Sequence, residues 1–142
     1  MFLENPKFAP QLSRFRKQKA ALLIRLQNEF SSLESTDQIS YHLPNPEDLR
    51  EIEIKISPGE SSYWSGLEFV FSIEVPIEYP FVPPRIRCTQ RPSAHPNFSE
   101  TGSVCLNVAR EDWTAAMDIE LIAQGLLTLM YLPGLSEPLD QV

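Results

Sequence analysis

The stretch Glu51-Ile52-Glu53-Ile54-Lys55-Ile56 alternates charged and apolar side chains, which is typical of a strand with one buried face. The same period of two recurs over residues 68–75 and in Arg85-Ile86-Arg87-Cys88. Together with a run over Ile39–Leu43, these segments predict four strands joined by short turns. We expect an antiparallel meander, with Cys88 on its apolar side as a core residue.

Apolar residues at helical spacing stand before and after this sheet in the chain. The first set begins beyond Ser13, which we expect to cap a helix that packs on one face of the sheet. The second set follows Asp118, a favourable N-cap, and ends before Pro133, whereas residues 89–117 sustain no period. The predicted class is α+β, in the order N-terminal helix, four-stranded antiparallel meander, irregular segment and central helix. The first apolar stripe consists of Phe15, Leu22, Leu23, Leu26, Phe30 and Leu33.

The chain has 142 residues, of which 42% are apolar, and this is enough for one domain with a substantial core. We assign residues 1–12 to an N-terminal arm and residues 13–142 to the core domain. The sequence has two cysteines, no secretion signal and no apolar run of membrane length. These features favour a reducing, intracellular setting without membrane contact.

Charge is distributed unevenly along the chain. Residues 1–27 hold six basic and one acidic side chain, a balance of +5, while the remaining residues hold six basic and eighteen acidic, a balance of −12. Phosphate backbones would be repelled by so acidic a body, so a nucleic-acid partner is not expected. The basic segment favours an acidic protein partner, and the alternative is a solvated helix face.

The sequence from His95 to Asn107 places a thiol and a carboxamide in one irregular loop. Cys105 stands eight residues after Asn97, which follows His95-Pro96. A thiolate is a nucleophile, and a carboxamide can donate hydrogen bonds to an oxyanion. Two alternatives are a buried structural thiol and a cysteine hydrolase that pairs Cys105 with His95 but lacks an identifiable third residue. We interpret His95 as a hydrogen-bonding anchor of the loop in preference to a proton shuttle.

This loop resembles the catalytic centre of the ubiquitin-conjugating enzymes, and the similarity extends from about Leu22 to Leu139. Residues 79–84, Tyr-Pro-Phe-Val-Pro-Pro, are similar to the family's Tyr-Pro-x-x-Pro-Pro loop, in which one X-Pro bond can be cis. The resemblance implies that Cys105 carries ubiquitin or a related modifier as a thioester, and that Asn97 donates to the oxyanion or orders the loop that does. It also implies structural roles for His95 and Pro96, and neither a cofactor nor a metal.

The resemblance extends to residues that meet other proteins. It implies that Phe81 faces the ligase, together with Ala115 and Ala116 of a second loop in which Ala115 replaces the family's usual proline. The alternative for both loops is packing at the edge of the core. Glu137 stands 32 residues after Cys105, where the family carries an acid beside the incoming lysine, and its alternative is a solvated charge.

Residues 105–113, Cys-Leu-Asn-Val-Ala-Arg-Glu-Asp-Trp, look like the neddylation branch, whose members carry the Nedd/Rub modifier to cullins. The resemblance therefore implies an activating enzyme, a RING-type ligase and a cullin-like target as partners, in the cytoplasm and nucleus. A ubiquitin carrier of the same fold is the alternative. A non-catalytic binding module is a further one, although the presence of Cys105, Asn97 and Glu137 argues against it.

The two ends of the chain carry further expectations. Phe2 and Leu3 resemble an abbreviated form of the apolar arm that docks on the activating enzyme in the neddylation branch. We expect the basic helix face to meet the same enzyme through Arg14, Lys17 and Arg25. The sequence ends at Val142, so the fold implied by the resemblance is one without the family's last two helices.

Overall fold

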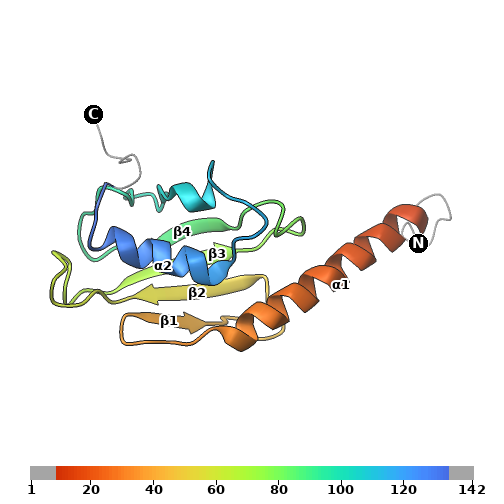
Figure 1. Cartoon of the computed structure of the whole chain (residues 1–142), viewed down its shortest axis with the longest axis horizontal. Coiled ribbons are helices and arrows are strands. Elements are labelled where there is room, and N and C mark those ends of the chain that lie inside the picture. Colours follow the sequence, from red (N-terminus) through yellow and green to blue (C-terminus); the bar gives the residue numbers. More distant parts are fainter. Residues whose placement is uncertain (1–8, 135–142) are drawn as a thin grey trace.

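The computed structural model describes residues 9–134, which form a four-stranded sheet, two α-helices and one 3₁₀ helix. Figure 1 shows their arrangement. The predicted order of elements is confirmed, and a short 3₁₀ helix, η3, lies in the irregular segment. The elements are α1 (Ala9–Ser32), β1 (Ile39–His42), β2 (Glu51–Ile56), β3 (Phe69–Glu74), β4 (Arg85–Gln90), η3 (Asn107–Ala109) and α2 (Ile119–Leu129).

The sheet is the predicted antiparallel meander, with neighbouring strands in the order β1-β2-β3-β4. In β2 the three isoleucines are buried, while Glu51 is exposed and Glu53 and Lys55 are partly exposed. The register places Ile54 opposite Phe71 of β3, and both side chains are fully buried. Cys88 of β4 is also buried in the core cluster, so the expectation for this residue is confirmed.

Helix α2 covers one face of the sheet in Figure 1. Its start is set by Asp118, whose carboxylate oxygen Oδ1 accepts a hydrogen bond from the Leu121 N–H at 2.9 Å, and this confirms the predicted N-cap. The buried residues of α2 pack into the core cluster that also holds the strand side chains. They are Ile119, Ile122, Ala123, Leu126 and Leu129.

Helix α1 differs from the prediction at its start and in its packing. It begins at Ala9, so Ser13 lies inside the helix and does not cap it; Pro10 stands in the first turn, where its missing N–H removes no helical hydrogen bond. Figure 1 shows its N-terminal part extending away from the sheet. Accordingly, Phe15 is 50% exposed, and only the second half of the stripe reaches the core, through Leu22 and Leu26. The helix that covers the sheet is thus α2 and not α1.

Within residues 9–134, neither helix combines the length and the apolar character that crossing a bilayer requires.

Candidate active site

Part of the irregular segment after β4 forms backbone hydrogen bonds with that strand. Ser103 forms an isolated bridge with Arg87, and the Cys88 N–H donates to the Gly102 carbonyl at 2.8 Å. Gly102 has a φ of +94°, and a Cβ at this position would lie 2.8 Å from the Cys88 carbonyl oxygen. Glycine is therefore required for the close approach that brings the following residues beside β4.

Cys105 and Asn97 are held together by two hydrogen bonds. The Cys105 N–H donates to the Asn97 carbonyl at 2.8 Å, and the Asn97 amide nitrogen Nδ2 donates to the Cys105 carbonyl at 3.3 Å. The amide oxygen Oδ1 accepts from the Gly134 N–H at 2.9 Å. Cys105 is 2% exposed and Asn97 is 0% exposed. These contacts are those of a residue that orders the loop, and donation to an oxyanion stays a prediction.

His95 anchors the loop from inside the core. Its Nδ1 accepts from the Asn97 N–H at 3.0 Å, so the neutral ring carries its proton on Nε2 and donates to the Leu129 carbonyl at 2.9 Å. The ring stacks on Phe98 with centroids 4.3 Å apart. Burial lowers the pKa of His95, which favours this neutral form. Because both ring nitrogens bind backbone groups, the hydrolase alternative lacks its base. Pro96 lies in the turn closed by the Phe98 N–H and the His95 carbonyl, 3.2 Å apart.

Arg110 is a site residue that sequence reasoning missed. Its guanidinium nitrogen Nη1 lies 3.3 Å from the Cys105 sulfur, Sγ, and donates to it. A cavity of about 490 Å³ lies beside them and is lined by residues on both sides of Cys105, namely Val104 and Leu106, and by Arg110. The sequence offered only the proximity of the two residues along the chain, because the contact depends on the turn that η3 makes between them.

The two predicted ligase loops lie together. The Trp113 indole N–H donates to the Pro80 carbonyl at 2.8 Å, and its ring lies 5.8 Å from that of Tyr79. The Tyr79-Pro80 bond is cis, as the loop motif suggested. Phe81 is 81% exposed beside this junction, and Ala115 and Ala116 are exposed as well. The side chain of Phe81 is therefore available to a partner, and its contact with a ligase stays a prediction.

Glu29 connects α1 to the Tyr79 loop and to the start of α2, a role that sequence reasoning did not find. Its Oε2 accepts from the Arg25 Nε and from the Tyr79 hydroxyl, each at 2.7 Å, and its Oε1 accepts from the Ile119 N–H at 3.0 Å. Arg25 also donates to the Met117 carbonyl at 3.1 Å. The hydrogen bond to Glu29 raises the pKa of Arg25. Burial is the main reason that the pKa of Tyr79 is raised, and its hydrogen bond to the Glu29 carboxylate raises it further. Arg25 is thus engaged within the chain, whereas Arg14 and Lys17 are exposed on α1.

Three predicted site residues, Phe2, Leu3 and Glu137, lie outside the described residues.

The second thiol, Cys88, is buried, and burial raises its pKa, so its thiolate is disfavoured. In the described part of the chain, no group of three or more histidine, cysteine or acidic side chains is placed to hold a metal ion.

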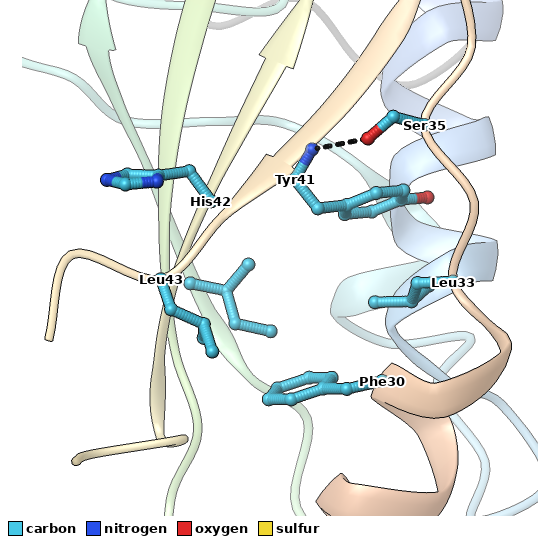
Figure 2. A pocket seen from close by; sticks show the side chains of 7 residues that line it. Phe30, Leu33, Ser35, Tyr41, His42 and Leu43 are labelled. Atoms are coloured by element: carbon cyan, nitrogen blue, oxygen red, sulfur yellow. Dashed lines mark hydrogen bonds between the residues drawn. The ribbon is translucent and has the colours of Figure 1, made fainter. Parts of the chain in front are cut away.

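A second cavity, drawn in Figure 2, lies at the β1 edge of the sheet, and β4 forms the opposite edge. Its volume is about 250 Å³, and the Tyr41 N–H donates to the Ser35 hydroxyl at 3.4 Å in its wall. Burial raises the pKa of Tyr41 to about 12. Figure 2 shows side chains from the end of α1 facing those of β1 across it. The lining residues are Phe30, Leu33, Ser35, Tyr41, His42, Leu43 and Ile52, and none belongs to the candidate active site.

Comparison with known proteins identifies the kind of chain that carries this site. A family model described as "Ubiquitin-conjugating enzyme" matches residues 25–142. A NEDD8-conjugating enzyme UBC12 of Yarrowia lipolytica is 35% identical over 89% of this chain and 69% of the relative. A Nedd8-conjugating enzyme of Drosophila melanogaster, UbcE2M, is 33% identical over 97% of this chain and 75% of the relative. The solved structure of S. cerevisiae Ubc12 superimposes with a TM-score of 0.80 at 26% identity, covering 99% of this chain and 80% of that one.

Proposed function

The chain belongs to the ubiquitin-conjugating enzyme family, and we propose from this that it carries a Nedd8-type modifier as a thioester on Cys105 and transfers it to a lysine of a target. The observation that carries the assignment is the pairing of Cys105 with Asn97 in a loop fixed by His95. The choice of modifier is supported by relatives named as NEDD8-conjugating enzymes and by the neddylation-like residues 105–113.

The reaction has two steps at one sulfur atom. The Cys105 thiolate attacks the thioester carbonyl that an activating enzyme holds, a new S–C bond forms, and the activating enzyme's cysteine leaves as a thiolate. A lysine amine then attacks the same carbonyl, the C–N bond forms, and the Cys105 thiolate departs. The proton lost by the amine goes to solvent or to a nearby base, for which Glu137 is the candidate. ATP is consumed earlier, by the activating enzyme.

A conjugating enzyme works with a modifier, an activating enzyme and a ligase. The exposed Phe81, with Ala115 and Ala116 of the adjoining loop, is the surface we assign to the ligase, because Trp113 fastens both loops into one patch. We further propose a RING-type ligase, a cullin-like target and a place in the cytoplasm and nucleus.

The function is tested by charging the purified protein in parallel with the Nedd8 and ubiquitin activating enzymes, each with ATP and its own modifier. We expect a reductant-sensitive adduct with Nedd8, and an adduct that resists reductant in Cys105→Ser, because an alkoxide leaves less readily than a thiolate. Cys88→Ser is the matched control and should charge like the parent.

Charging with ubiquitin alone would instead identify a ubiquitin carrier. An adduct on Cys105→Ala, or the lack of any adduct on the parent protein, would refute the assignment of Cys105.

A further inference from the structure

Arg110 approaches the sulfur that the proposed function places at the centre of the chemistry. Its Nη1 is 3.3 Å from Sγ, and its backbone is fixed on both sides. The Arg110 N–H donates to the Asn107 carbonyl at 2.9 Å, and its carbonyl accepts from the Trp113 N–H at 3.2 Å. The turn therefore fixes the backbone of Arg110 within reach of Cys105, and the half-exposed side chain makes the contact with Sγ.

We propose that Arg110 is a further catalytic residue, whose guanidinium stabilises the negative charge on the Cys105 sulfur in both transfer steps. The inference rests on the proposed function of Cys105. In charging, the sulfur is the attacking thiolate, and in discharge it is the leaving thiolate. In charging, the guanidinium thus stabilises the thiolate from which the attack starts, and in discharge it stabilises the thiolate that departs.

The other groups around the Cys105 sulfur offer little stabilisation to a thiolate, so the contact with Arg110 matters more. Cys105 is 2% exposed, so few water molecules can solvate a thiolate at this position. His95 does not supply a positive charge, because its two ring nitrogens bind backbone groups and burial favours its neutral form. Glu111 lies 3.7 Å from Nε of Arg110, yet both side chains are more than half exposed and the pair is solvent-screened.

The matched variants are Arg110→Lys and Arg110→Met, which have side chains of similar length and differ in charge. We expect Arg110→Met to charge and discharge about fivefold more slowly than the parent, a modest effect because the Arg110 side chain is half exposed and water screens its charge. Arg110→Lys should keep most of the rate. Arg85→Met removes the same charge from the wall of the same cavity and should react like the parent.

A second measurement avoids the activating enzyme. The uncharged protein is treated with iodoacetamide at one fixed pH, and modification of Cys105 is followed by peptide mass spectrometry. Arg110→Met should react about fivefold more slowly than Arg110→Lys. Millimolar guanidinium ion should accelerate Arg110→Met and leave the parent unchanged, a rescue that a purely structural role for Arg110 does not predict.

The proposal is overturned if the lysine and methionine variants show equal rates in both assays. Failure of the proposed function would give a different result, because the parent would then form no thioester with either modifier. The alkylation rates of the lysine and methionine variants would still test the role of Arg110.

Discussion

Asn97 binds two backbone groups through its side chain, the Cys105 carbonyl through Nδ2 and the Gly134 N–H through Oδ1. A side chain with these partners fixes the position of the thiol before any substrate arrives. The oxyanion role implied by the resemblance requires the same Nδ2 to serve a transient intermediate. The two roles differ in which half-reaction depends on Asn97.

Asn97→Ala should lower the free energy of unfolding by about 1–3 kcal/mol, because it removes the hydrogen bond to the carbonyl of the buried Cys105 and the one to the Gly134 N–H. We expect charging and lysine discharge to fall together, since both need the thiol in place. Urea denaturation and single-turnover gels measure these quantities, and Asn28→Ala, exposed on α1, is the control. A loss of about a hundredfold confined to discharge would instead identify Asn97 as the oxyanion donor.

His95 makes the stability of the loop dependent on pH. The fold holds the pKa of His95 below its usual value of about 6.5, so the unfolded chain binds more protons as the pH falls through that value. Stability is full above about pH 6.5 and should decline below it, by up to about 1.4 kcal/mol per pH unit. Thermal unfolding at several pH values tests this. The decline should be weaker in His95→Gln and unchanged in His42→Gln, a substitution at an exposed histidine.

At the scale of elements, Glu29 joins α1 to the Tyr79 loop and to the first turn of α2. Glu29→Ala leaves Arg25, the Tyr79 hydroxyl and the Ile119 N–H without their shared acceptor. We expect a loss of about 3 kcal/mol in the free energy of unfolding, against little for Glu34→Ala at an exposed position. Tyr79→Phe should cost about 1 kcal/mol, and the double variant should cost less than the sum. Equal losses for the two glutamate variants would contradict this role.

The elements that sequence reasoning predicted are those with local signals. Alternation reveals the strands, and Asp118 marks the start of α2, because each pattern is complete within a few residues. The start of α1 and the exposure of Phe15 were mispredicted, since an apolar stripe shows which face can be buried and not whether a partner reaches it. Cys105 and Asn97 were also predicted as a pair, because both lie within one short loop motif. The Glu29 contacts join residues 50 and 90 positions apart, so no local pattern could reveal them.

At the scale of the whole molecule, the basic residues of α1 are carried away from an acidic body. The N-terminal part of the helix extends outward in Figure 1, and Arg14, Arg16, Lys17 and Lys19 are exposed along it. Such a dipolar molecule is oriented by an acidic partner before contact, which raises the rate of association. The basic face is therefore the surface that we assign to the activating enzyme.

Arg14→Glu combined with Lys17→Glu should lower the initial charging rate several-fold. Added salt should slow the parent far more than this variant, because salt screens an electrostatic attraction that the variant no longer has. Arg85→Glu with Arg87→Glu makes the same change in net charge on β4 and should have a smaller effect. If the parent charges equally fast at low and high salt, the basic face is only solvated, and the apolar Phe2 and Leu3 become the residues to test.

The indole of Trp113, which is hydrogen-bonded to the Pro80 carbonyl beside the exposed Phe81, can serve as a fluorescent reporter of this surface. The chain contains two tryptophans, and the other, Trp64, is 5% exposed and donates to the Ala94 carbonyl at 2.8 Å. Trp113 is only partly buried, so its fluorescence depends on whether water or protein lies against the junction of the two loops. In Trp64→Phe, Trp113 is the only tryptophan of the chain, and excitation above the tyrosine absorption reports on it alone. A ligase that covers Phe81 should shift this emission to shorter wavelength, and its binding can then be titrated without any attached dye.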